Sequence, residues 1–548
     1  MLKRILASRW VYALPLLACL LVMLPRLLSP QFGLMDDGRS LITAQKLSDG
    51  VWDMRVDVQE GRSRPLYWLY FSLFYALFGK QPFWFFLGNT LVLLVATLAL
   101  MSLVRGLGCS RLHAWLAGLL FALAGPVIEN FYTLTKGETP QVAWLVLSLL
   151  AMFAFEKAAV RAYRLFWLLL AALLLWSAHA SKETSLVVLP ISLVWWGAAW
   201  LGSRRRAWRA AWRLPTLGAY VLANGLAAAA FLALRAATVG MSLTGGSYTG
   251  RYAFDPAQIS ASLIRWAGWL ARDFAYAVPL AILALAAFFV LRDRARLPVQ
   301  LAALLWMAAW IVVFMPWGLM AEYYMLPFAL GLAVAAGGWI EEGIFLWRAG
   351  AWARRGAAVA FALAALLFVA GLFNNLTTAR VQLAVDAANA QALRHLAEIA
   401  PQGSAVLVNI QVPNEYFFAS EDHLWYIWER PDLNLRPVAG DTMPALGEVG
   451  HYYLLVPQVE NQPLQTVRMG VVEETQQIWN SVLEGYMAGQ GWQPVTTVQR
   501  NVRLSVVDFA RLFCPFIPTR AFCAVDAPLV DTRLFAYGWQ IYSLEISK

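Results

Sequence analysis

Long apolar runs recur through the first two thirds of the chain, and they decide what it can fold into. About eleven of them reach the length that a helix needs to cross a membrane. The runs lie near residues 10–29, 82–104, 112–128, 139–155, 164–180, 184–201, 214–235, 276–292, 298–316, 323–345 and 354–373. Only 14% of the 548 residues are charged, against about 25% in an average soluble protein. A polytopic membrane protein is expected, and a disordered or water-soluble chain is excluded.

Lys and Arg gather in alternate short loops and set the expected orientation. The basic loops carry Lys3, Arg4, Arg9, Arg105, Arg111, Lys157, Arg161, Arg164, Arg204, Arg205, Arg206, Arg209, Arg213, Arg292, Arg294, Arg296, Arg348, Arg354 and Arg355. This bias explains the net charge of +10 better than a nucleic-acid partner does. We expect a multi-pass protein of the cell (inner) membrane, with a cytoplasmic N-terminus. No small-residue cleavage site follows the first run, so it is expected to be a retained anchor.

Two long segments are expected outside, at residues 30–81 and 374–548. The tail is richer in polar residues and has shorter apolar runs. A helix is predicted over 377–400 and another over 476–487, with strands at 404–409, 452–456 and 535–546. The predicted fold is an all-α polytopic membrane bundle with a C-terminal extracytoplasmic α/β domain. The predicted domains are 1–373, transmembrane, and 374–548, outside it.

Cys514 and Cys523 lie close together in the tail. A disulfide between them would suit an oxidising compartment. The alternative is a pair of unbonded core cysteines.

Two adjacent carboxylates, Asp36 and Asp37, follow the first run directly. Like charges at close range raise the pKa of one of them, which suits a general base. The pair could also hold a divalent cation through its oxygens. The structural alternative is a helix cap followed by a turn, since Asp is favoured at N-caps and Gly in turns.

The same loop continues with Arg62 and Arg64 at the start of an aromatic, amphipathic stretch, residues 65–78. This stretch is typical of a helix that lies in the membrane interface. Arginine's planar fork favours phosphate, so either residue could bind a phosphorylated substrate. The alternative is an anchor to lipid headgroups.

Further ionisable residues are predicted at the same outer end of the bundle. Lys136 with Glu138, and Lys182 with Glu183, fall in two outer turns. Ionisable groups near the membrane boundary are costly, which makes them functional candidates. A simple Lys–Glu pair or snorkelling helix ends would also explain them. A glycine-rich outer stretch ending at Arg251, and a last outer turn with Glu322, complete the set.

Several sequence motifs of other enzyme classes are missing. The five histidines form no short-spaced ligand pair, and the chain has no phosphate-binding Gly-x-x-x-x-Gly-Lys loop and no Gly-x-Ser-x-Gly elbow. A zinc enzyme, an ATP-driven transporter and a serine hydrolase are therefore disfavoured.

The layout resembles that of the GT-C fold glycosyltransferases, in particular the protein O-mannosyltransferases and the aminoarabinose transferase of lipid A. The resemblance rests on an anchor helix, the acidic pair Asp36-Asp37, the Arg62-Ser-Arg64-Pro65 stretch before an aromatic helix, and the lysine-bearing turn at Lys182. It covers most of residues 1–345. The family often has Asp-Glu where this chain has Asp-Asp, so which carboxylate acts stays open.

The resemblance implies transfer of a hexosyl or pentosyl group from a polyprenyl-phosphate donor to a hydroxyl of a glycan, lipid or protein at the outer membrane face, usually with inversion. Displacement at an anomeric carbon needs a base for the hydroxyl and positive charge for the departing phosphate. Asp36 is expected to be the base, with Asp37 orienting it or binding a cation. Lys182 and Arg64, then Arg251 and Lys136, are expected to bind the phosphate.

Other functions stay open. A ligase or polymerase of surface glycans is the main alternative among transferases. A transporter or flippase of lipid-linked sugars would show inverted repeats and charges near the membrane midplane, which this chain does not. A scaffold whose tail binds partners would not depend on Asp36.

Overall fold

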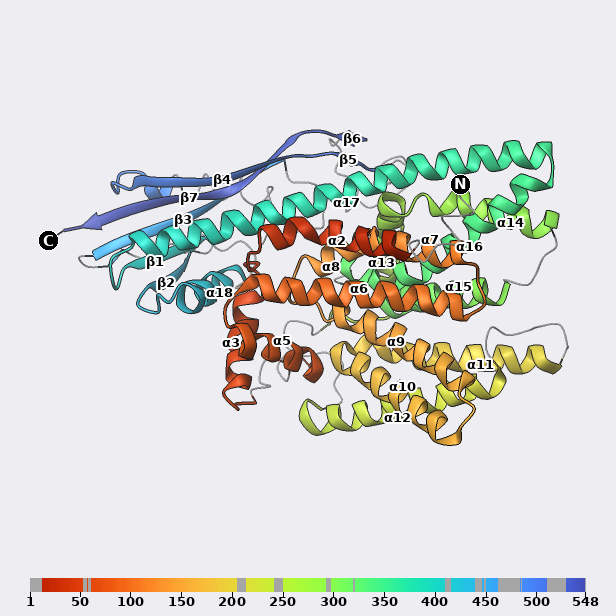
Figure 1. Cartoon of the computed structure of the whole chain (residues 1–548). Coiled ribbons are helices and arrows are strands. Elements are labelled where there is room, and N and C mark those ends of the chain that lie inside the picture. The colour runs from red at the N-terminus through yellow and green to blue at the C-terminus, as the bar shows by residue number, and fades with distance from the viewer. Residues whose placement is uncertain are drawn as a thin grey trace.

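The computed structural model describes residues 12–52, 57, 61–204, 213–240, 250–291, 297–318, 321–409, 415–438, 446–447, 450–461, 483, 485–509 and 529–547. Its helices form a bundle, and a sheet-containing domain extends from one end of it (Figure 1). Cys514, Cys523 and most of the helix expected at 476–487 lie outside the described residues. The expected basic residues Lys3, Arg4 and Arg9 lie outside them as well.

The helices follow the expected runs. In chain order they are α2 (Ala13–Leu28), α3 (Asp37–Ser48), α5 (Pro65–Phe78), α6 (Pro82–Gly106), α7 (Arg111–Ala122), α8 (Gly125–Phe131), α9 (Glu138–Lys157), α10 (Arg161–Ser181), η2 (Glu183–Val187), α11 (Val188–Arg204), α12 (Leu214–Thr238), α13 (Pro256–Asp273), α14 (Ala277–Leu291), α15 (Leu297–Phe314), η4 (Glu322–Met325), α16 (Leu326–Ala349), α17 (Ala351–Ile399), α18 (Glu415–Asp422) and η5 (His423–Ile427).

The predicted count of eleven spans differs from the structure. Among the described residues, eight helices are long and apolar enough to cross a membrane, or up to ten if each of two bent pairs is one span. The α7–α8 pair bends by 53° and the α13–α14 pair by 87°. The first expected span, α2, has only 16 described residues. The run expected at 112–128 is thus two helices with a bend between them, which hydropathy does not report, whereas α13 lies in the segment 236–275, before the run expected at 276–292.

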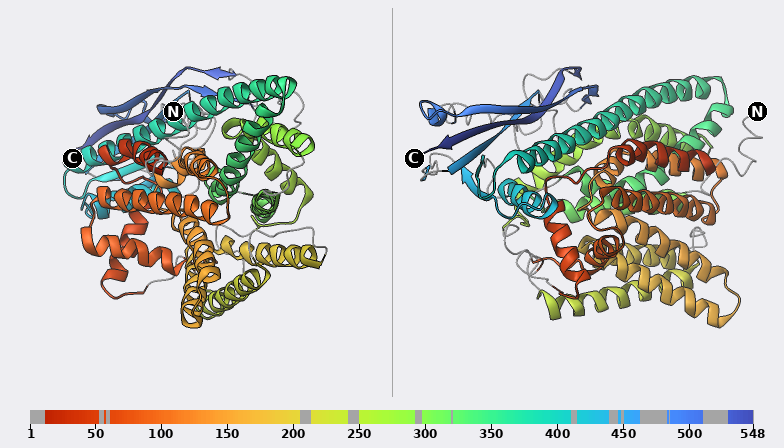
Figure 2. Two further views of the ribbon diagram at one scale, coloured as in Figure 1. Left: turned by 45° about the vertical axis from the view of Figure 1, so that its right-hand side comes forward. Right: turned by 60° about the vertical axis from the view of Figure 1, so that its left-hand side comes forward.

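Helix α17 joins the two parts of the molecule. The span expected at 354–373 and the helix expected at 377–400 form one helix of 49 residues. Figure 1 shows it running from the far end of the bundle to the sheet, and both views of Figure 2 agree. The predicted domain boundary at 373 therefore falls inside a continuous helix.

The tail forms a mixed five-stranded sheet in the order β2-β1-β3-β7-β4. The three expected strands are observed within β1 (Ala405–Asn409), β3 (Gly450–Glu460) and β7 (Leu534–Ile546). The remaining strands are β2 (Asn434–Val438), β4 (Gln493–Arg503) and the short pair β5 (Val506–Val507) and β6 (Val530–Asp531). Strand β1 pairs in parallel with β2 and β3, whereas β7 is antiparallel to β3 and β4.

One face of the sheet packs on the second half of α17. Val381, Val385 and Leu396 lie on one helix face, at the spacing expected of an amphipathic helix, and are buried against the sheet. The hydroxyl of Tyr537 and the indole N–H of Trp539 both donate to Asn389 Oδ1, each at 2.9 Å. This core fixes the tail to the end of the bundle that carries α3 and α5.

Candidate functional site

The acidic pair lies in a tight turn between α2 and α3, residues 33–37, which we name the acidic turn. Asp36 is exposed and adopts a left-handed backbone conformation, with φ of 70°. Asp37 begins α3 and is buried, and its Oδ2 accepts a hydrogen bond from the Gly33 N–H at 2.7 Å. Asp is among the residues that tolerate a left-handed backbone best. The fold therefore separates two identical residues into an exposed and a buried carboxylate.

Burial raises the pKa of Asp37 well above its ordinary value, and the Gly33 N–H opposes this shift. A second buried carboxylate, Asp386 of α17, faces the same glycine. A Cβ built on Gly33 would lie 3.4 Å from Asp37 Oδ2 and 3.5 Å from Asp386 Oδ1. Asp386 is paired with Arg26 of α2 at 2.7 Å, and both side chains are buried. The acidic turn thus rests on an ion pair between α2 and α17.

The tail also contacts the acidic turn. His423, the first residue of η5, lies with its Nε2 3.1 Å from the carbonyl oxygen of Gly33. Burial lowers the pKa of His423 to about 4, so the ring is neutral at pH 7 and Nε2–H is the donor to this carbonyl. Next to it, Asp422 accepts two hydrogen bonds from Arg39 of α3, at 2.8 and 3.2 Å.

Arg64 and Arg62 both approach Asp57, a buried residue that the sequence reasoning did not single out. Arg64 lies 3.4 Å and Arg62 3.9 Å from Asp57 Oδ1, and Trp68 donates to Oδ2 at 2.7 Å. The guanidinium of Arg64 also lies 5.1 Å from the ring centre of Tyr67. The Tyr67 hydroxyl is hydrogen-bonded to Ser40 of α3, which joins α5 to the helix that Asp37 begins.

Glu183 is held by Arg235, which sequence reasoning also missed. A guanidinium nitrogen of Arg235 donates to Glu183, and another donates to the Gly61 carbonyl at 2.8 Å. Glu183 also accepts from the Ser63 N–H at 2.6 Å. This network fastens the Arg62–Arg64 stretch to the bundle.

Lys136, Glu138 and Lys182 meet where α9 begins and α10 ends, and we name this group the lysine corner. Lys182 pairs with Glu138 at 2.8 Å, and the Glu138 side chain is buried. Lys136 Nζ lies 3.2 Å from the ring centre of Tyr323, and Lys182 Nζ lies 6.0 Å from the same centre. The two ammonium groups thus share one aromatic ring.

Gly137 allows the lysine corner to close. A Cβ at this position would lie 2.6 Å from the Ser181 carbonyl oxygen and 3.5 Å from Lys182 Cδ. Any larger residue would push the Lys136 turn away from Lys182.

Glu322 is buried in an ion-pair network rather than exposed at the boundary. Arg272 lies 2.6 Å from Glu322 and makes two hydrogen bonds to Asp273, at 2.8 and 2.7 Å. Arg272 and Asp273 were not predicted from the sequence. A Cβ at Gly125 would lie 2.6 Å from Glu322 Oε1, so the network is packed tightly against α8.

Arg251 lies in the segment before α13, where its carbonyl accepts from the Gly318 N–H at 2.7 Å. Its neighbour Tyr252 forms a bridge with Trp317. The rest of the expected flexible stretch, residues 241–249, lies outside the described residues.

Most of the predicted site residues thus form three groups at one end of the bundle, namely the acidic turn, the Arg62–Arg64 stretch with Glu183, and the lysine corner, whereas Glu322 and Arg251 belong to none of these. Arg64 and Tyr67 lead from the acidic turn to Glu183, and Glu183 is adjacent in sequence to Lys182 of the lysine corner. No group of three or more His, Cys, Asp or Glu side chains among the described residues could hold a metal ion.

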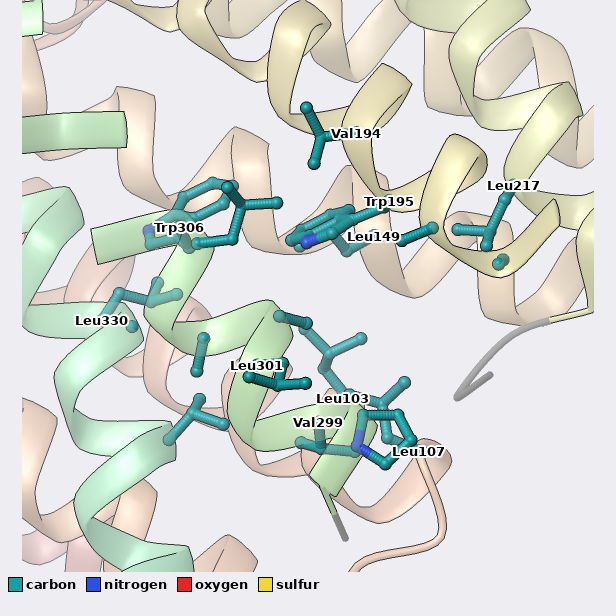
Figure 3. Close-up of a pocket in the computed structure, with 18 residues that line it drawn as sticks. Leu103, Leu107, Leu149, Val194, Trp195, Leu217, Val299, Leu301, Trp306 and Leu330 are labelled. Carbon is teal, nitrogen blue, oxygen red and sulfur yellow. The ribbon is translucent and has the colours of Figure 1, made fainter. Parts of the chain in front are cut away.

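An apolar cavity of about 320 Å³ lies between α6, α9, α11, α12, α15 and α16 (Figure 3). Its lining extends to Leu107, Leu217 and Pro298, near the ends of these helices that are farthest from the lysine corner. The rings of Trp195 and Trp306 stack beside it with centres 6.3 Å apart. Leu330, which lines the cavity, comes seven residues after Tyr323, the ring beside the lysine corner. Seven residues correspond to about 10 Å along a helix. The cavity has the size and lining of a site for an apolar chain.

A scan against family models and a search of curated protein sequences return no match for this chain. Solved structures do resemble it. ArnT from Cupriavidus metallidurans bound to undecaprenyl phosphate is 15% identical, with a TM-score of 0.46, over 97% of this chain and 98% of that chain. The apo form of ArnT is 16% identical, with a TM-score of 0.47 and the same coverage. The oligosaccharyltransferase AglB from Archaeoglobus fulgidus, in complex with an inhibitory peptide and a dolichol-phosphate, is 12% identical, with a TM-score of 0.46, over 79% of this chain and 65% of that chain.

Proposed function

We propose that this chain is a membrane glycosyltransferase that moves a sugar from a polyprenyl-phosphate donor to a hydroxyl of a glycan, lipid or protein at the outer membrane face. One observation carries the proposal: an exposed carboxylate on a fixed turn and a cluster of cations lie at the same end of a membrane bundle, above an apolar cavity. The carboxylate suits the acceptor hydroxyl, the cations suit the donor phosphate, and the cavity suits the polyprenyl chain.

The exposed Asp36 is the proposed general base. It takes the proton of the acceptor hydroxyl while the acceptor oxygen bonds to the anomeric carbon and the bond from that carbon to the phosphate oxygen breaks. Attack from the face opposite to the leaving phosphate inverts the anomeric carbon. Asp37 is buried and bonded to the Gly33 N–H, so its role is to hold the acidic turn in shape.

The cations are proposed to bind the departing phosphate. Lys182 of the lysine corner is partly exposed, and Lys136 lies beside it across the ring of Tyr323. Arg64 stands between the lysine corner and the acidic turn, where its fork can bond two phosphate oxygens. Polyprenyl phosphate leaves as a stable anion, so no general acid is needed.

The deeper cavity is proposed to take part of the polyprenyl chain. Its lining is apolar, and it lies on the membrane side of the lysine corner. A phosphate at Lys182 would leave the first isoprene units directed toward it.

The test is transfer of radiolabelled sugar by the purified protein in lipid nanodiscs. Undecaprenyl- and dolichyl-phosphate sugars are the first donors to offer, with and without a chelator. The Asp36→Asn variant is compared with Asp49→Asn, an exposed aspartate at the end of α3 that serves as the matched control. We expect wild type and Asp49→Asn to consume a donor, with or without chelator, and Asp36→Asn to lose transfer while staying folded.

Two results would contradict the proposal. Unchanged transfer in both Asp36→Asn and Asp37→Asn would mean that the acidic turn is not the site. Movement of an intact lipid-linked sugar across vesicle membranes, without transfer from any donor, would identify a transporter.

A further inference from the structure

The histidine at the start of η5 reaches from the tail to the acidic turn, and the proposed chemistry has not used it. His423 is 3% exposed and lies outside the transmembrane bundle. Its ring nitrogen Nε2 lies 3.1 Å from a backbone atom of the acidic turn, the carbonyl oxygen of Gly33. A buried histidine side chain that donates a hydrogen bond to a backbone carbonyl restrains the conformation of that backbone.

Gly33 is bonded on both of its sides. Its N–H donates to Asp37 Oδ2 at 2.7 Å, and its carbonyl accepts from His423 Nε2. Between these anchors and the start of α3 the chain turns through Asp36 in the left-handed conformation. A non-glycine residue keeps that conformation only when its surroundings impose it, and such residues are frequent at functional sites.

The contact between the tail and α3 is close at a second point. A Cβ added to Gly38 would lie 3.0 Å from Asp422 Cβ and 3.0 Å from His423 Cδ2. Arg39 binds the carboxylate of Asp422 through two nitrogens. His423 itself opens a π-helical turn, a geometry often found at functional sites. The tail is therefore docked tightly enough on α3 to position a single side chain.

We propose that His423 is a positioning residue that reaches from the tail through Gly33 to hold Asp36 in its catalytic orientation. The tail then completes the acidic turn rather than merely covering the bundle. The inference rests on the proposed function, since it assigns the orientation of the proposed base. It does not require His423 to touch a substrate or to change its protonation state.

The test compares four forms of the full chain. His423→Ala removes the donor. His423→Gln keeps an amide N–H at the place of Nε2. His451→Ala is the matched control, because His451 is exposed on β3 of the same domain. We expect His423→Ala to lower kcat for transfer about 10- to 100-fold, as misplacement of a catalytic group by about 1 Å does.

The changes in kcat and KM distinguish a positioning role of His423 from a role in donor binding and from general loss of structure. The KM for the donor should change by less than about twofold in His423→Ala, because the phosphate contacts are intact. His423→Gln should recover kcat to within about threefold of wild type, and His451→Ala should match wild type. A fall in kcat that His423→Gln fails to recover, or a change in KM alone, would overturn the inference.

A second measurement does not depend on activity. Hydrogen–deuterium exchange of the peptide covering residues 31–41 should be faster in His423→Ala than in wild type, and unchanged in His451→Ala. If wild type transfers no sugar, the proposed function fails, while exchange still reports on the turn. If exchange of this peptide is the same in His423→Ala and wild type, His423 does not hold the acidic turn.

Discussion

The acidic turn and the lysine corner are held in different ways. The acidic turn depends on three distant parts of the chain: Arg26 near its beginning, Asp386 on α17 and His423 in the tail. The lysine corner depends on neighbouring bundle helices, through the Lys182–Glu138 pair and the ring of Tyr323. The proposed base is therefore positioned by tertiary docking of a separate domain, whereas the phosphate-binding cations are fixed by the bundle itself.

The difference implies that the two halves of the site can be disturbed separately. Damage to the tail should affect the chemical step and spare donor binding. Damage to the lysine corner should affect donor binding and the stability of the bundle.

The largest effect is expected at the proposed base. Asp36→Asn removes the proton acceptor without changing its size, so transfer should fall about 10²- to 10⁴-fold. Binding of the donor, measured by isothermal titration with a non-transferable analogue, should stay within about threefold of wild type. Loss of donor binding in this variant would show that the two halves of the site are not separate.

The lysine corner should respond with a loss of stability as well as activity. Lys182→Met leaves the buried carboxylate of Glu138 without the cation 2.8 Å away, which should cost about 3 kcal/mol. The melting temperature in detergent should fall. The double variant Lys182→Met/Glu138→Leu should regain most of that temperature but not transfer, because the phosphate still lacks its cation. Recovery of transfer in the double variant would rule out Lys182 as a phosphate ligand.

A smaller effect is expected from a wedge between α3 and the tail. Gly38→Ala places a methyl group 3.0 Å from Asp422 and His423, so one element must shift. We expect transfer to fall about tenfold and stability by about 1 kcal/mol. Gly356→Ala in α17 is the control, since nothing lies within 4 Å of a Cβ there. Equal effects in both variants would argue against a tight contact.

The smallest expected effect is on the pH dependence of stability, through His423. A buried histidine with a pKa of about 4 stays neutral in the folded chain, while the unfolded chain takes up a proton below pH 6.5. Stability from this group is present above pH 6.5 and is lost as the pH falls toward 4. Between pH 7 and 5.5 wild type should lose about 1 kcal/mol more stability than His423→Gln. Parallel melting curves for the two proteins over this range would contradict the burial of His423.

The sequence predicted the helices and strands well, because hydrophobic periodicity is a local property. It did not predict the bend within the run at 112–128, the helix α13 or the continuity of α17. The sequence becomes more polar at residue 374, which suggested a boundary there. Because a helix can continue through such a change in polarity, α17 is not interrupted.

The partners in the site were harder to find from the sequence. Arg235 stands alone near the end of the apolar helix α12, and such an isolated charge is a usable signal. Asp386 and His423 gave no signal, since each becomes part of the site only when the tail docks. The sequence also could not separate Asp36 from Asp37, because adjacent identical residues differ only through the turn that buries one of them.

The length of the unbroken helix α17 sets the distance between the bundle and the sheet. At 1.5 Å and 100° per residue, 49 residues span about 74 Å, more than twice the hydrocarbon thickness of a bilayer. The number of residues in α17 therefore sets how far the sheet lies from the bundle and which way the sheet faces. One residue inserted after the membrane portion would raise the tail by about 1.5 Å and rotate it by about 100°, which moves His423, Asp422 and Asp386 out of register with the acidic turn together. The length of this segment is then as much a part of the site as any side chain in it.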